Sequence, residues 1–155
     1  MIKKSMGKVL GVTAIVTLAL AACGDNLFGP DPEDVVFAES LGIDLTLMME
    51  TASGLFFRDD VVGEGPVAAT DDIATVTLTG WLVDGTEFDS GLFTFQIGAA
   101  GTIVGFSEGV TGMQAGGQRT FVVPASLGYG SSGNGIIPKN AVLVFQVTLD
   151  VLITP

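Results

Sequence analysis

Few side chains in this sequence can do chemistry, and they are few in kind. The chain of 155 residues contains no histidine and a single cysteine, Cys23. These counts exclude a Ser-His-Asp triad, a zinc site with histidine ligands and a disulfide within the chain. Any catalysis must therefore use carboxylates, hydroxyls, backbone groups or the shape of a pocket, and we expect no metal and no cofactor.

The single cysteine follows an export signal. The first eight residues hold three lysines, and a short apolar run from Val9 to Leu20 leads to the sequence Leu-Ala-Ala-Cys, which ends at Cys23. A basic start, about a dozen apolar residues and small residues before the cut are typical of a secretory signal peptide, whereas a spanning helix needs about 20 apolar residues. We therefore predict a signal peptide over residues 1–22.

Residues 20–23 (LAAC) are similar to the bacterial lipobox, in which the cysteine is acylated (typically with palmitate) and becomes the new N-terminus. We predict lipid attachment at Cys23; the alternatives are a plain signal peptide that happens to contain a cysteine, or a weak anchor helix. Gly24 follows Cys23. In the Gram-negative sorting pattern, glycine rather than aspartate after the cysteine is compatible with transfer to the outer membrane. We therefore favour the bacterial outer membrane, facing the periplasm, and keep the outer face of the cytoplasmic membrane as the alternative.

The charge of the remaining chain argues against one class of partner. After residue 22, three cations (Arg58, Arg119 and Lys139) stand against 17 acidic residues, a net charge of −14. A surface this acidic repels phosphate backbones, so we expect no nucleic-acid binding.

The mature chain divides into a leading segment and one domain. Residues 24–34 are rich in Gly, Pro and Asp, which predicts a flexible or extended tether. Residues 35–50 are more apolar, and they predict either a short helical turn or an edge strand that packs on the domain. Residues 23–50 therefore form the lipidated cysteine, tether and extension, and residues 51–155 form the domain.

The domain reads as strands with one helical interruption. Alternating apolar residues predict about five strands. They lie at 54–62, 73–82, around 93–97, around 120–123 and 143–151. Ile103, Phe106, Val110 and Met113 recur at helical spacing, and Gly116-Gly117 ends that stripe. We predict an α+β domain in which a curved antiparallel sheet of about five strands wraps across one short helix.

Several segments in order resemble the FK506-binding-protein (FKBP) family of peptidyl-prolyl cis-trans isomerases. The matching segments are 79–90 (TGWLVDGTEFDS), 103–110 (IVGFSEGV), 113–117 (MQAGG), 127–130 (LGYG), 136–138 (IIP) and 143–147 (LVFQV). The resemblance covers about residues 54 to 153. It implies the same fold as the strand pattern, a prolyl isomerase, and proline-containing polypeptides as partners. We expect a monomer, although the sequence does not fix the oligomeric state.

The resemblance also implies a pocket between the sheet and the helix. Its walls would be Phe88, Phe93, Ile103, Ile137 and Phe145, with Phe106 at the floor. Asp89 and the Tyr129 hydroxyl would be the polar members, with Asp89, Tyr129 and Phe88 as the catalytic set. The backbone amide of Ile137 would face a substrate carbonyl.

Two positions depart from the family pattern. Leu78 stands where the family usually has a pocket tyrosine, and Phe106 where the best-known members have tryptophan. Taken singly, each pocket position also has an ordinary structural interpretation: core for the apolar residues, a turn for Asp89, and a loop for Tyr129.

The leading hypothesis is an isomerase that accelerates X-Pro rotation in exported proteins by binding the twisted amide in an apolar aromatic pocket. The alternative, motivated by Leu78, is a peptide-binding or chaperone lipoprotein with weak isomerase activity. A third hypothesis is a surface lipoprotein that uses the fold only as a scaffold.

Overall fold

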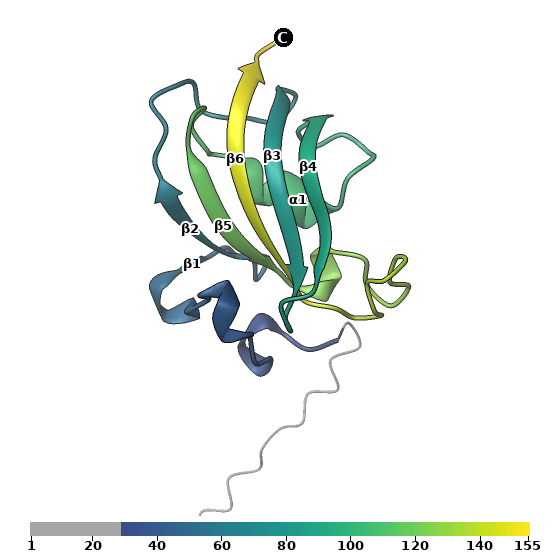
Figure 1. Cartoon of the computed structure of the whole chain (residues 1–155). Helices are drawn as coiled ribbons and strands as arrows, with labels where there is room; N and C mark the ends of the chain where they lie inside the picture. The colour runs from purple at the N-terminus through teal and green to yellow at the C-terminus, as the bar shows by residue number, and fades with distance from the viewer. Residues whose placement is uncertain (1–28) are drawn as a thin grey trace, which may run out of the picture.

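In the computed structural model, which describes residues 29–155, one antiparallel sheet curves around one short helix (Figure 1). The predicted signal peptide, Cys23 and residues 24–28 lie outside the described residues. The strands are β1 Met49–Glu50, β2 Phe56–Val61, β3 Ile73–Leu82, β4 Glu87–Gln96, β5 Gln118–Val123 and β6 Leu143–Ile153. The sheet order is β1-β2-β5-β6-β3-β4, and all neighbours are antiparallel. The predicted α+β class is confirmed, with six strands among the described residues.

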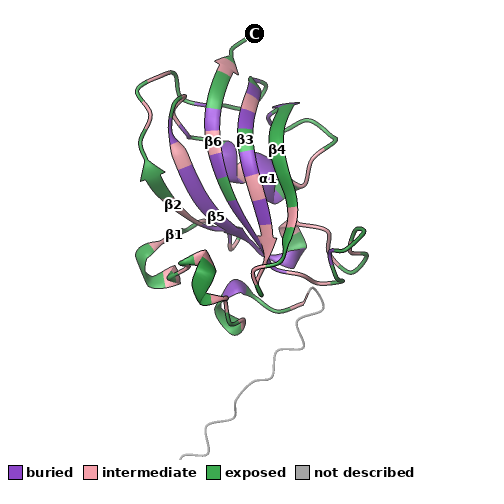
Figure 2. Cartoon of the chain, in the orientation of Figure 1, coloured by how far each residue is buried: buried purple, intermediate pink, exposed green. Residues whose placement is uncertain are grey.

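Strand β3 shows why the period-two pattern was informative. Ala74 and Val76 are buried toward the helix, while the intervening threonines lie on the outer face of the sheet. β3 pairs with β4 on one side and with β6 on the other, so the central strands are buried along much of their length (Figure 2). The concave face that results is largely apolar, with Ala74, Val76 and Leu78 of β3 among its buried side chains.

The short helix α1, Val104–Val110, lies against this concave face. Phe106, Val110 and the following Met113 are buried, as the helical stripe predicted. Two glycines permit the close approach: a Cβ built on Gly105 would overlap Val123, and one on Gly109 would lie 2.7 Å from the Phe121 ring. The helix can sit this near to β5 only because those two positions carry no side chain.

The buried Arg119 holds the C-terminal end of α1 by hydrogen bonds. Arg119 on β5 donates from Nε to Asp59 Oδ1 at 2.6 Å, and from Nη1 to the carbonyl oxygens of Gly109 and Thr111 at 3.0 and 3.1 Å. Its guanidinium also stacks over the Phe57 ring, 4.5 Å from the centroid. One side chain thus joins β2, β5 and the C-terminal end of α1.

The segment before β2 packs on the domain. The tether was predicted to extend to residue 34, but Pro32–Asp34 form a 3-10 helix in which Pro32 is buried. For residues 35–50 both alternatives hold, because the 3-10 helices Glu39–Leu41 and Leu45–Leu47 precede the edge strand β1. Apolar side chains of this segment cover an outer cluster on the sheet. That cluster is Phe56, Val122, Val142 and Val144.

Candidate active site

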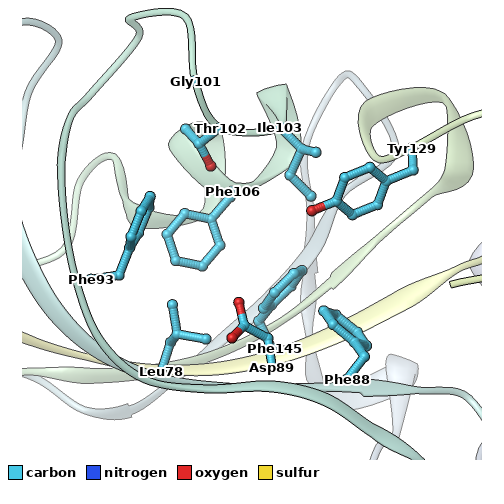
Figure 3. Close-up of a pocket in the computed structure, with 10 residues that line it drawn as sticks. All are labelled: Leu78, Phe88, Asp89, Phe93, Gly101, Thr102, Ile103, Phe106, Tyr129 and Phe145. Atoms are coloured by element: carbon cyan, nitrogen blue, oxygen red, sulfur yellow. The ribbon is translucent and has the colours of Figure 1, made fainter. Parts of the chain in front are cut away.

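The concave side of the sheet holds a cavity of about 210 Å³ between β4, the start of α1 and the loop after Pro124 (Figure 3). It is lined by Leu78, Phe88, Asp89, Phe93, Gly101, Thr102, Ile103, Phe106, Tyr129 and Phe145. Eight of the nine side chains predicted for the pocket are therefore found together. They come from β3, β4, β6, α1 and two loops, so no single element defines the site.

Strand register brings the cavity wall together. Gly80 on β3 is paired with Asp89 on β4 and with Phe145 on β6, which places these two side chains on the same stretch of sheet. A Cβ on Gly80 would lie 2.7 Å from the Phe88 ring and 3.0 Å from the Phe145 ring. The missing side chain at position 80 therefore makes the space in which the two rings meet.

Aromatic contacts surround the floor of the cavity. The Phe106 ring is buried and lies edge-on to Phe145 at 5.2 Å and to Phe93 at 6.1 Å between centroids. Phe88 meets Phe145 edge-to-face at 5.5 Å. Phe93 is 36% exposed, so this ring marks the mouth of the cavity. The packing holds an apolar surface that is open at one side.

Three polar side chains enter this apolar space. The carboxylate of Asp89 and the hydroxyl of Tyr129 point into the cavity from different sides, and the Thr102 hydroxyl also turns toward it (Figure 3). None of the three side chains forms a hydrogen bond with another described residue. Thr102 was missed by the sequence reasoning, because a single threonine in a glycine-rich loop carries no periodic signal.

The structure does not support the expected role of the Ile137 amide. Its N–H donates to the carbonyl oxygen of Asn134 at 2.9 Å, and the buried Ile137 side chain does not line the cavity. By contrast, the N–H of Ile103, at the residue that precedes α1, has no hydrogen-bond partner among the described residues. Ile103 does line the cavity, so it is the better-placed backbone donor.

The described residues contain no group of three His, Cys, Asp or Glu side chains arranged to hold a metal ion. In residues 29–155, no helix has the length and hydropathy needed to cross a membrane.

Comparison with known proteins defines the class. Residues 65–150 match the family described as FKBP-type peptidyl-prolyl cis-trans isomerase. The chain belongs to this family, and the family's enzymatic activity is peptidyl-prolyl cis-trans isomerisation of proline-containing polypeptides.

Individual relatives agree with this assignment. An FK506-binding protein of Neisseria meningitidis serogroup B is 41% identical over 102 residues, which cover 62% of this chain and 94% of the relative. The isomerase FkpA of Aeromonas hydrophila is 42% identical, but the match covers 64% of this chain and only 38% of FkpA.

Solved structures show the same fold. The crystal structure of AtFKBP13 superimposes with a TM-score of 0.62 at 34% identity, over 66% of this chain and 95% of that one. FkpA from Escherichia coli gives a TM-score of 0.66 at 30% identity, over 74% of this chain and 55% of FkpA.

Proposed function

We propose that the cavity is the active site and that it accelerates X-Pro rotation by favouring the twisted amide. The observation that carries this proposal is the aromatic cavity over Phe106, into which the Asp89 and Tyr129 side chains project with no hydrogen-bond partner among residues 29–155. A mostly apolar pocket with a few convergent polar groups is the usual form of a small binding site.

The chemistry needs no nucleophile. Rotation about a peptide bond crosses about 18–20 kcal/mol because the planar amide loses resonance, and X-Pro bonds exchange in tens of seconds or more unaided. In the twisted state the carbonyl is no longer conjugated with the proline nitrogen, so the oxygen carries less charge. A dry aromatic wall therefore disfavours the planar amide more than the twisted one, which is preferential binding of the transition state.

Each polar group then has a separate role. The Tyr129 hydroxyl and the Ile103 N–H would hold the substrate backbone by hydrogen bonds, and the Asp89 carboxylate would orient the substrate electrostatically. The walls Leu78, Phe88, Phe93 and Phe145 would exclude water once the prolyl ring covers Phe106.

The direct test is an isomerisation assay on a short X-Pro peptide, measured by magnetisation-exchange NMR with the full-length protein in a mild detergent. Wild type should accelerate exchange, and Gly80→Val, which forces a branched side chain into the Phe88 and Phe145 rings, should abolish that acceleration. Circular dichroism must show that the variant stays folded. Wild-type exchange at the uncatalysed rate would contradict the proposal.

A second candidate function follows from one lining residue. Leu78 is buried at the cavity wall and carries no hydroxyl, which favours a peptide-binding or chaperone role with weak isomerase activity. Suppression of client aggregation without isomerisation would select this function. Recovery of isomerisation in Leu78→Tyr would then identify the missing hydroxyl as the cause.

We also propose that the protein acts in the bacterial envelope on exported polypeptides, as a lipid-anchored monomer. This proposal is supported by the lipobox-like sequence that ends at Cys23 and by the basic, apolar residues before it.

A further inference from the structure

A second cavity lies on the opposite face of the sheet, away from α1. It has a volume of about 460 Å³, and its lining includes Ser40, Trp81, Thr120, Val144 and Gln146. Strands β3, β5 and β6 form the base of this outer cavity, and the 3-10 helix Glu39–Leu41 forms part of its rim. The volume lies within the range of about 300–1,000 Å³ that is usual for small-molecule sites. Because residue 40 precedes the family match at 65–150, the outer cavity depends on the N-terminal segment of this chain.

Strand register brings the base of the outer cavity together. Gln146 on β6 is paired with Thr120 on β5, and Val144 on β6 is paired with Trp81 on β3. Alternate residues of a strand share a face of the sheet. Gln146 and Val144 therefore face the outer cavity, whereas Phe145 between them faces the aromatic cavity. A ligand in one cavity would leave the other open, since the sheet separates them.

The Thr120 hydroxyl is held in one orientation before any ligand binds. Thr120 is 5% exposed, and its hydroxyl donates a hydrogen bond to Asp60 Oδ2. Asp60 is itself held by Arg58, whose Nε donates to Oδ1 at 2.7 Å. Because its proton is already donated, the Thr120 oxygen can only accept a hydrogen bond from a ligand.

The other polar groups of the outer cavity complement this acceptor. The indole N–H of the half-buried Trp81 can only donate a hydrogen bond, whereas the Gln146 amide and the Ser40 hydroxyl can both donate and accept. None of these three side chains forms a hydrogen bond with another described residue. Among the described residues that line the outer cavity, none is Asp, Glu, Lys or Arg, so a charged ligand would find no opposite charge there.

These groups fit a neutral ligand that donates and accepts hydrogen bonds and has an apolar face for the indole. A pyranose ring meets all three requirements, because each hydroxyl group donates and accepts and the C–H faces of the ring are apolar. A polyproline segment does not, because it has no N–H to donate to the Thr120 oxygen. We propose that the outer cavity binds a neutral saccharide, with one hexose ring packed against Trp81. Such binding holds the protein on a carbohydrate polymer while the aromatic cavity stays free on the other face of the sheet.

The test uses Trp81 as the reporter, because it is the only tryptophan of the chain. Its fluorescence is followed while full-length protein, in a detergent without a sugar head group, is titrated with cellohexaose, chitohexaose or maltohexaose. We expect at least one saccharide to cause a saturable change in emission. Gln146→Ala should weaken the affinity for that saccharide by roughly five- to tenfold, and Ser40→Ala by roughly threefold, because each removes hydrogen bonds to the ligand.

Gln96→Ala is the matched control. Gln96 lies at the far end of β4, where its amide donates to the Asp71 carbonyl oxygen and does not line the outer cavity. Its affinity should stay within about twofold of wild type. Phe88→Ala, which changes the aromatic cavity, should also bind the saccharide like wild type.

The absence of a saturable change with all three saccharides would overturn the inference, as would an affinity that both Gln146→Ala and Ser40→Ala leave unchanged. Loss of binding in Phe88→Ala would place the saccharide in the aromatic cavity and overturn it as well. A change in emission caused by oligoproline but by no saccharide would make the outer cavity a peptide site instead. Every readout is a binding measurement, so the result does not depend on the outcome of the isomerisation assay.

Discussion

Phe88 and Phe145 illustrate how the candidate site depends on individual residues. Their rings meet edge-to-face at 5.5 Å above a position, Gly80, that must lack a side chain. Phe88 is half-buried, so one part of the ring packs and the other faces the cavity. A change at position 88 therefore alters water access more directly than a change at the fully packed floor.

The first prediction ranks Phe88 and Tyr129 by the loss of isomerase activity that their substitution causes. Phe88→Ala should lower kcat/KM by more than about tenfold, because an open wall lets water stabilise the planar, more polar amide. Tyr129→Phe should cost about 1 kcal/mol, or roughly fivefold in rate, since it removes one hydrogen bond and leaves the ring. The NMR exchange assay measures both rates. A larger loss of rate in Tyr129→Phe would show that the hydrogen bond contributes more than the exclusion of water from the cavity.

At this scale the sequence predicted side chains better than backbone groups. Phe88, Phe93, Phe106 and Phe145 could be assigned to the pocket because ring type and motif spacing are visible in the sequence. The direction of an amide is not visible, since it depends on the path of the loop. The N–H of Ile137 was misassigned for this reason, because the loop turns it toward Asn134.

At the scale of elements, α1 is held in place by close packing on β5, which two glycines without side chains permit. The helix has only seven residues, too few to be stable alone, so its packing on β5 must hold it. That packing requires Gly105 and Gly109 to face Val123 and Phe121. The start of α1 contributes Ile103 and Phe106 to the cavity, so a displaced helix would also change the site.

The second prediction follows from this contact. Gly109→Ala should destabilise the protein by about 1–3 kcal/mol, although alanine is the better helix former, because its methyl group would overlap the Phe121 ring. Val104→Ala, at an exposed position of the same helix, should change stability by less than about 0.5 kcal/mol. Urea unfolding measures both, and a Gly109→Ala protein as stable as wild type would contradict the packing argument.

The turn between β3 and β4 gives a prediction about pH. The Thr86 N–H donates to Asp84 Oδ1 at 2.9 Å, and this bond, helped by the Thr86 hydroxyl, lowers the pKa of Asp84 below its ordinary value of 3.8. A pKa lowered by folding means that ionised Asp84 stabilises the protein above that ordinary value. The stabilisation is lost as the pH falls through the lower pKa of the folded state.

Asp84→Asn should therefore lower the melting temperature at pH 6, and the difference from wild type should shrink as the pH falls below 3.8. Asp34→Asn is the control, because the Asp34 N–H donates to the Asp31 carbonyl oxygen, whereas its carboxylate accepts no hydrogen bond from the residues that the structure describes. Thermal melts monitored by circular dichroism at several pH values give the comparison. A difference that stays constant down to pH 2 would refute the role of the ionised carboxylate.

Strands could be predicted from the sequence where apolar and polar residues alternate over many positions. Residues 73–82 alternate over a whole strand, and β3 has those bounds in the structure. The two residues of β1 contain no period, so the sequence could not choose between strand and turn there. Val122 lies on the face of β5 turned away from the helix and is nevertheless buried, because the segment before β2 covers that face.

At the scale of the whole molecule, the packed N-terminal segment would limit how far a lipid anchor at Cys23 lets the domain stand from a membrane. Gly29 lies against Asn140, in the loop that precedes β6, and Pro30 lies near Pro138 and Lys139. Five residues lie between Cys23 and Gly29, and the six peptide units that join the two span at most about 20 Å. A lipid at Cys23 would therefore hold this end of the domain close to the bilayer, because residues 30–34 pack on the domain and add no reach.

The last prediction tests that anchor. Full-length protein produced in a bacterium should partition into membranes, and mass spectrometry should show an acylated N-terminus at Cys23, because the Leu-Ala-Ala-Cys sequence follows a basic and apolar start. Cys23→Ser should leave the protein unprocessed or soluble, without acyl chains, since no other residue of the chain carries a thiol. Asn26→Ala, three residues beyond the cysteine, should remain acylated and membrane-bound. A mature N-terminus at another residue, without acyl chains, would contradict the lipoprotein proposal and leave the isomerase domain's own chemistry unaffected.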